Sequence, residues 1–248
     1  MNLLSLLPAL AVVAGLYATV GHAGASGYIA VLTLAGMPAP EIRPLALVLN
    51  VLVASLATRQ FAAAGHLRPA LLPPLLAASV PAAALGGAIA LPVGMLQRLL
   101  AAVLLFSAWR LSGDPLRGGA LRGVPAPAVV SLTGGGLGLL AGLTGTGGGI
   151  FLTPWMILRG WLAPRQAAAV SAAFILVNSL AGLAGLLLRR GALALPPPLP
   201  LLGMATAVMG GGALGAWCGS RVFPPPLIRR LLALVLVVAS VKLLLPPG

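Results

Sequence analysis

Acidic side chains are almost absent from this sequence of 248 residues, which contains only Glu41 and Asp114. Both lie in short polar connections between apolar runs. Ionisable groups that move charge through a membrane lie inside the spans. The sequence therefore argues against a pump that works through a relay of buried carboxylates.

Cysteine is nearly as scarce, because Cys218 is the sole example. One cysteine excludes a disulfide within the chain and a metal site built from thiolates. Cys218 is most simply a small residue on a packed helix. We expect no metal and no other cofactor, and we assign no residue a catalytic role.

Charge of any kind is rare: charged residues make up 7% of the chain, against about 25% in a soluble domain, and hydrophobic residues make up 60%. Apolar runs of about 17 to 24 residues leave almost no polar sequence to cover a soluble core. The composition predicts an all-α polytopic membrane protein. We expect it in the inner membrane of a cell, in contact with the lipid bilayer.

The net charge of +13 comes from fourteen arginines and one lysine at the ends of the apolar runs. A protein that binds nucleic acid gathers its basic residues in a stripe or cluster, and this sequence has neither. Basic residues at span ends set the orientation of a membrane protein. We therefore expect no nucleic-acid partner.

Glycine is abundant, and Gly134 to Gly149 holds nine glycines in sixteen residues, followed directly by the apolar Ile150 to Pro154. Backbone polar groups cannot stay unpaired in lipid, so this cluster must be buried in protein or line a cavity. Glycines spaced by four let helices approach closely. This packing role fits Gly134, Gly138 and Gly142, and also a second set formed by Gly211, Gly215 and Gly219.

Gly145 and Gly147 to Gly149 differ, because consecutive glycines cost a helix about 1 kcal/mol each relative to alanine and form no single packing face. Unwinding there would free N–H groups, and a helix starting near Ile150 would add the positive end of its dipole. An anion suits such a place. A hinge without a ligand is the alternative.

The two halves of the chain repeat. Gly21 to Gly24 lie 124 residues before Gly145 to Gly148, and Asn50 corresponds to Asn178. We divide the chain into a first membrane repeat (1–111), a polar linker (112–123) and a second membrane repeat (124–248). Each repeat has about four hydrophobic segments, the first of them broken. Broken segments at matching positions indicate the substrate site in many secondary transporters.

Each broken segment is either one long span with an unwound middle or a re-entrant hairpin of two shorter helices. Single crossings divide the basic residues seven against eight, whereas hairpins put ten on one side and five on the other. The five are Arg43, Arg98, Arg189, Arg190 and Lys242. Because basic residues favour the cytoplasmic side, we prefer hairpins and inverted repeats, with the linker cytoplasmic and both termini outside.

His22 lies in the first break and is the only side chain in either break that titrates near neutral pH. It has a role in substrate binding or proton coupling, or it is a hydrogen-bonded structural group. Asn50 and Asn178 reach a central cavity or link helices. The candidate substrate-binding residues are Gly21, His22, Gly24, Ser26, Asn50, Thr144, Gly145, Thr146, Gly147, Gly148, Gly149 and Asn178.

The second half, with Gly138 to Gly149, Pro154 and Ala167 to Leu183, resembles the TauE/SafE family of sulfite and organosulfonate exporters. The first half repeats this pattern more weakly, through Gly21 to Gly24 and Asn50. The resemblance implies a polytopic inner-membrane permease for small anions such as sulfite or sulfoacetate. The first half departs from the pattern at His22, Ala25 and Ser26, which argues against a symmetric site.

The leading hypothesis is therefore an alternating-access transporter of a small anion. A homodimer is compatible with this hypothesis. The second is a cation or metabolite permease that uses backbone carbonyls at the same breaks. The third is an intramembrane serine protease, because Gly24 to Gly27 matches G-x-S-G. That enzyme needs a histidine on another span to activate Ser26, and His66 lies at a span end.

Overall fold

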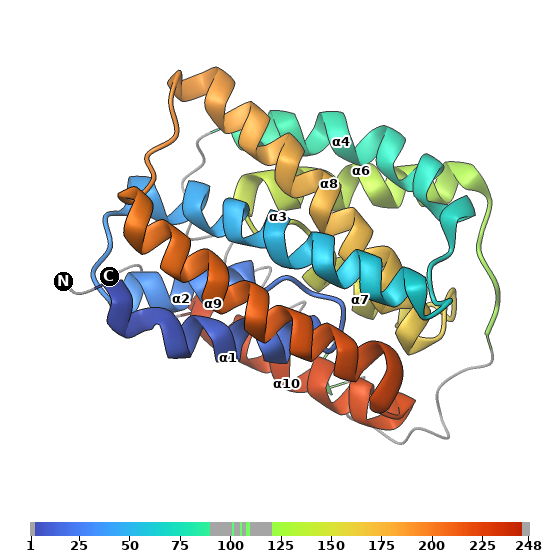
Figure 1. The fold of residues 1–248 in the computed structure, drawn as a ribbon. Helices are drawn as coiled ribbons and strands as arrows, with labels where there is room; N and C mark the ends of the chain where they lie inside the picture. Colours follow the sequence, from blue (N-terminus) through green and yellow to red (C-terminus); the bar gives the residue numbers. More distant parts are fainter. Residues whose placement is uncertain (1–2, 90–100, 102–104, 106–107, 110–120, 245–248) are drawn as a thin grey trace.

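The computed structural model describes residues 3–89, 101, 105, 108–109 and 121–244, and these form helices (Figure 1). Five of the helices are long and apolar enough to cross a membrane. The described elements are η1 (Leu3–Leu6), α1 (Leu7–Ala18), α2 (Ala25–Leu34), α3 (Ala39–Ala63), η2 (Pro69–Leu71), α4 (Leu72–Ala88), α6 (Pro127–Thr144), α7 (Gly149–Leu158), α8 (Pro164–Arg190), α9 (Pro198–Trp217), η4 (Cys218–Val222) and α10 (Pro225–Leu244). The expectation of an all-α polytopic membrane protein is confirmed.

The first broken segment is a hairpin. Helix α2 lies back against α1, because Gly27 contacts the Val13 and Tyr17 side chains. A single continuous span would carry Gly27 beyond the end of α1 and away from Val13. Figure 1 shows α2 running back toward the end of the molecule where α1 begins.

The second broken segment turns back in the same way. Gly148, at the start of α7, packs against Ala141 and the Leu137 carbonyl of α6. The two halves thus both open with a hairpin, of two shorter helices in the first half and of the spanning-length α6 with the shorter α7 in the second. The inverted relation of the halves and the division at 112–123 stay predictions, and most of that linker lies outside the described residues.

Hydrogen bonds between helix ends show which of these ends lie on the same side of the molecule. At one end, the Arg190 side chain donates a hydrogen bond to the Pro40 carbonyl. At the other end, Arg165 donates to the Phe223 carbonyl and the Arg122 amide to the Gly160 carbonyl. The hairpin alternative puts Arg122 and Arg165 on one side, and single crossings separate them. Which end faces the cytoplasm stays a prediction.

The fourth helix of each half packs on the other half. Helix α9 lies on α1 and α3, and α4 lies on α6 and α8. Glycines make both contacts close: a Cβ at Gly211 would lie 2.0 Å from the Ala11 carbonyl oxygen, and one at Gly134 would lie 2.1 Å from that of Leu75. Gly138, Gly142, Gly215 and Gly219 make similar contacts. The predicted packing role of both glycine sets is confirmed.

Helix α3 begins at Ala39, with Pro40 and Pro44 in its first two turns. Pro40 is tolerated because the first helical amides have no partner inside the helix. Pro44 removes the amide that would bond the Pro40 carbonyl, and Arg190 supplies a donor to that carbonyl at 3.0 Å. A side chain from α8 thus completes the first turns of α3.

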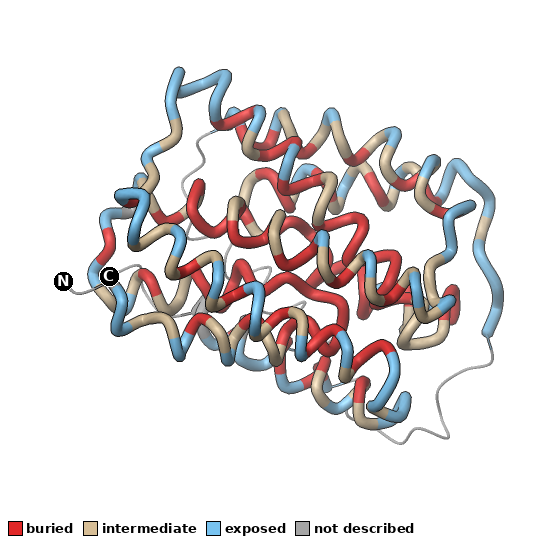
Figure 2. Tube along the Cα trace, viewed as in Figure 1, coloured by how far each residue is buried: buried red, intermediate tan, exposed pale blue. Residues whose placement is uncertain are grey.

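The deepest part of the molecule lies around the first break and the middle of α8. Residues 17–28 are all buried, as are residues 167–175 (Figure 2). Helices α3 and α8 pack against each other there. These two long helices carry the side chains that meet the breaks.

Candidate functional site

The first break depends on glycines in left-handed backbone conformations. Gly21 has φ 75° and Gly24, which precedes α2, has φ 102°. A Cβ at Gly21 would lie 2.2 Å from the Ala168 carbonyl oxygen. The break therefore presses its backbone directly onto α8.

The second break has the same character. Gly145, Gly147 and Gly148 all have positive φ, between 70° and 78°. Helix α6 ends at Thr144, and α7 begins at Gly149, next to Ile150 where the sequence predicted a helix start. The predicted unwinding at the glycine cluster is confirmed.

The start of α7 presents unpaired backbone donors. Within the described part of the chain, the amides of Gly147, Gly148, Gly149 and Ile150 make no hydrogen bond. The first pairing amides are those of Phe151 and Leu152, which both donate to the Gly148 carbonyl. Such free amides carry the positive end of the helix dipole and favour an anion.

Asn50 of α3 joins the two breaks. Its Oδ1 accepts a hydrogen bond from the Ala25 amide, the first of α2, at 3.0 Å. Its Nδ2 donates to the Thr146 carbonyl at 3.3 Å and to the Ser179 Oγ at 3.4 Å. Asn50 is fully buried, so one side chain fixes the tips of both hairpins to each other.

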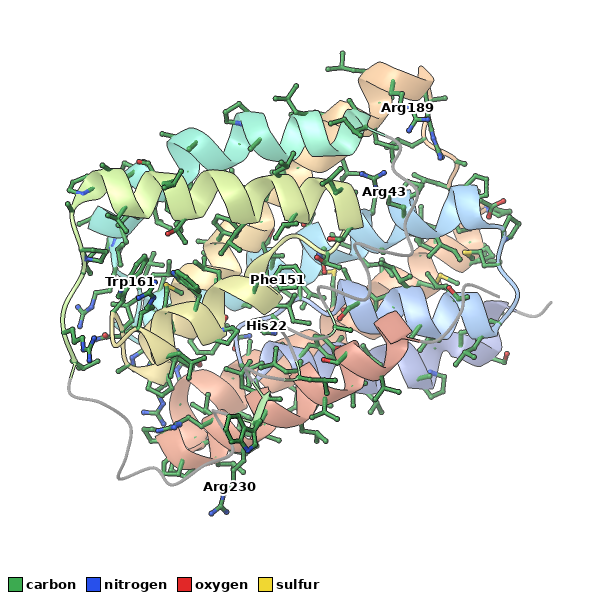
Figure 3. The ribbon with its side chains drawn as sticks, turned by 180° about the vertical axis from the view of Figure 1, so that it is seen from behind. His22, Arg43, Phe151, Trp161, Arg189 and Arg230 are labelled. Atoms are coloured by element: carbon green, nitrogen blue, oxygen red, sulfur yellow. The ribbon has the colours of Figure 1, made fainter. Side chains whose placement is uncertain are left out.

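His22 makes the second link between the halves. Its Nε2 lies 2.9 Å from the Thr153 Oγ1 of α7, which in turn donates to the Ser171 Oγ of α8 at 2.7 Å. The imidazole is buried, and Figure 3 shows it near the centre of the molecule. The only titratable side chain of the breaks therefore lies against the opposite half.

Other predicted residues make local bonds. The Ser26 Oγ donates to the Tyr17 hydroxyl. The Thr144 Oγ1 lies 2.8 Å from the Thr146 Oγ1, so these two hydroxyls form a pair at the end of α6. Asn178 donates from Nδ2 to the Phe174 carbonyl of its own helix. None of these three contacts joins the two halves.

The hydrogen bonds of the histidines do not favour the protease hypothesis. His22 pairs with Thr153, and the His66 Nε2 lies 2.8 Å from the Ser220 carbonyl oxygen. The Ser26 hydroxyl donates a hydrogen bond to the Tyr17 hydroxyl. A serine nucleophile requires a base within hydrogen-bond reach.

Sequence reasoning missed Thr153, Ser171 and Ser179, because single hydroxyl residues in apolar helices are ordinary and carry no spacing signal. It also treated Arg43 as a topological residue. The Arg43 Nη2 donates to the carbonyls of Gly86 and Gly87, at 3.2 and 3.4 Å, and to that of Gly142. Seven residues separate Arg43 from Asn50, which is two helical turns on one face. This spacing could have indicated from the sequence that Arg43 lies on the same face of α3 as the candidate site residue Asn50.

The electrostatics of the breaks are one-sided. Glu41 is the only acidic residue in the described part of the chain, and it lies in the first turn of α3. The described residues contain no group of side chains that would hold a metal ion. Helix starts, amides and hydroxyls therefore dominate the site, and these suit a negatively charged ligand.

Comparison with known proteins agrees with this picture. The family described as "Sulfite exporter TauE/SafE" matches residues 6–243. The chain is 38% identical over 237 residues to a protein of Sinorhizobium fredii named "Probable membrane transporter protein y4hK", and the match covers 94% of each chain. No solved structure matches the chain. The chain therefore belongs to the TauE/SafE family, and it is a multi-pass membrane transporter.

Proposed function

We propose that the chain is a permease for a small anion, namely sulfite, sulfoacetate or a related sulfur-containing or organic anion. The observation that carries this proposal is the meeting of the two breaks at Asn50, next to the unpaired amides that begin α7. The anion binds between the hairpin tips. The candidate contacts are backbone amides of Gly147 to Ile150 and hydroxyls of Ser26, Thr144 and Thr146.

Charge supports an anion as substrate. The helix starts at Ala25 and Gly149 both contribute positive potential to the same region. Glu41, the one described acid, is distant from the tips along α3, so it does not oppose an anion there. The family description, sulfite exporter, is in keeping with an oxyanion.

The helix packing supports alternating access. One set of helices is α1, α2, α3 and α9, and the other is α6, α7, α8 and α4. Each set carries one break, and α3 and α8 form the main contact between the sets. Rocking of one set against the other would open the breaks to each side of the membrane in turn.

The second candidate is a cation or metabolite permease that uses the carbonyls of the breaks. The Thr146 carbonyl faces Asn50 at the tip, so such a site has at least one oxygen in place.

For the anion permease we propose the inner membrane, both termini outside and a homodimer as the assembly.

The test uses purified full-length protein in liposomes and radiolabelled sulfite and sulfoacetate. The double variant Gly147→Leu with Gly148→Leu should abolish uptake, because a Cβ at Gly147 would lie 2.8 Å from Ile175 Cγ2 and 2.9 Å from Ser179 Oγ. Gly136→Leu is the control, since no described residue lies within 4 Å of a Cβ there. It should transport like the wild type. A wild type that moves no anion, or moves cations instead, would refute the proposal.

A further inference from the structure

Arg43 is a half-buried cation for which the described residues supply no acidic partner. It lies in the second turn of α3, inside a segment long and apolar enough to span the membrane, and its side chain is half-buried. No ion pair to Arg43 is present in the described part of the chain, and Glu41 on the same helix does not form one. Intramembrane arginines pair with acids or carbonyls and mark the routes of ions.

The guanidinium uses only one of its three nitrogens for the protein. Nη2 donates to the carbonyls of Gly86, Gly87 and Gly142, which end helices α4 and α6. Nε is buried without a partner, and Nη1 makes no hydrogen bond to any described residue. Helix ends thus hold the charge in place and leave two nitrogens for a ligand.

Arg43 lies next to the second break. A Cβ at Gly145, the residue that follows α6, would lie 2.8 Å from Arg43 Cγ, so the arginine stem covers this glycine. Two residues further on, a Cβ at Gly147 would lie 3.0 Å from Asn50 Nδ2. Arg43 and Asn50 therefore lie along one face of α3, at the edge and at the centre of the break.

Further positive charge lies on the outer side of Arg43. Arg189 and Arg190, at the end of α8, are exposed, and their positive charges repel that of Arg43. Arg190 is held there by its hydrogen bond to the Pro40 carbonyl. In Figure 3, Arg43 is drawn between Arg189 and the region of His22. The three arginines attract anions toward the break.

We propose that Arg43 is an anion-binding residue, at which an oxyanion docks on Nε and Nη1 before it reaches the hairpin tips. This inference rests on the proposed function, since it adds a binding position to the same permeation route. Arg43 would then determine specificity, because a planar guanidinium favours oxyanions with two oxygens in reach over simple halides.

The test measures sulfite uptake into proteoliposomes at alkaline pH with Arg43→Gln, Arg43→Lys and the control Arg59→Gln. Gln removes the charge but keeps a donor for a helix-end carbonyl. We expect the KM of Arg43→Gln to rise about tenfold or more, with a smaller rise for Lys. Arg59→Gln, which removes one charge from an exposed position near the far end of the same helix, should stay within about twofold of the wild-type KM.

A purely structural clamp would give a different pattern. It would lower the melting temperature and the amount of active protein, and hence the maximal rate, at an unchanged KM. An unchanged KM in Arg43→Gln would overturn the inference. If that variant does not fold, Arg43→Lys decides by the same criterion. A wild type that moves no anion would refute the proposed function itself, and active transport with Arg43-independent KM would refute only this inference.

Discussion

At the residue scale, the two asparagines at matching positions of the halves have unequal surroundings. Asn50 uses both ends of its amide, through Ala25, Thr146 and Ser179. Asn178 is equally buried, yet its Oδ1 has no hydrogen-bond partner among the described residues. One asparagine stabilises the fold by satisfying backbone groups, and the other carries the desolvation cost of a buried acceptor.

We predict opposite effects of removing the two amides. Asn50→Leu leaves the buried Ala25 amide unpaired and removes the donor to the Thr146 carbonyl, which should lower the free energy of unfolding by about 1 to 3 kcal/mol. Asn178→Leu removes an unpaired acceptor, and the Phe174 carbonyl keeps its bond within the helix. This variant should be neutral or more stable. Thermal unfolding of the detergent-solubilised protein measures both, and an equal loss in the two variants would contradict the prediction.

At the element scale, glycine decides how closely helices pack. In α9, Gly211 lies against the Ala11 carbonyl of α1, whereas its neighbour Gly210 is exposed and has no described residue within 4 Å of a Cβ. The two positions share a helix and differ only in the face on which they lie. They form a matched pair that separates packing from helix propensity.

Gly211→Ala should therefore destabilise the protein, because its Cβ would lie 2.0 Å from a backbone oxygen and α1 must move away. The expected loss is about 1 to 3 kcal/mol. Gly210→Ala should change stability little, or raise it by up to about 1 kcal/mol through its better helix propensity. Melting temperatures in one detergent give the comparison. Tolerance of Gly211→Ala would show that the α1–α9 contact is looser than described.

At the scale of the whole molecule, the two hairpins decide which helix ends lie together on each of its two sides. The start of α3 meets the end of α8 on one face, through Pro40 and Arg190. The start of α8 meets the α9–α10 connection on the other, through Arg165 and Phe223. Figure 1 shows the beginning of α1 and the end of α10 at the same end of the molecule.

This arrangement predicts a labelling pattern in a Cys218→Ser background. Single cysteines at Pro38 and Ala192, both exposed, should react with an impermeant maleimide from one side of the membrane. Cysteines at Ala70 and Leu121, also exposed, should react only from the opposite side. Single crossings would instead separate Pro38 from Ala192. Labelling of those two from different sides would rule out the hairpins.

Much of this architecture was predictable from the sequence, because glycine has few uses in lipid. Its clusters marked both breaks, and its spacing by four marked the packing faces of α6 and α9. The unequal bonds of the two asparagines were not predictable, since matching positions suggest equal roles. Arg43 was missed because an arginine near a span end usually contacts water. Only the tertiary fold brings Gly86, Gly87 and Gly142 to it.

Because the fourth helix of each half packs on the other half, the order in which the helices are synthesised affects how the protein folds. Helix α4 leaves the ribosome before α6 and α8, on which its small-residue face packs, have been made. Helix α4 must therefore wait for both partners until the chain has been made as far as the end of α8 at Arg190. Helix α9 meets a partner that already exists. The fold is thus completed only after the carboxyl-terminal half has been made. A chain stalled after α4 should be a target for membrane quality control.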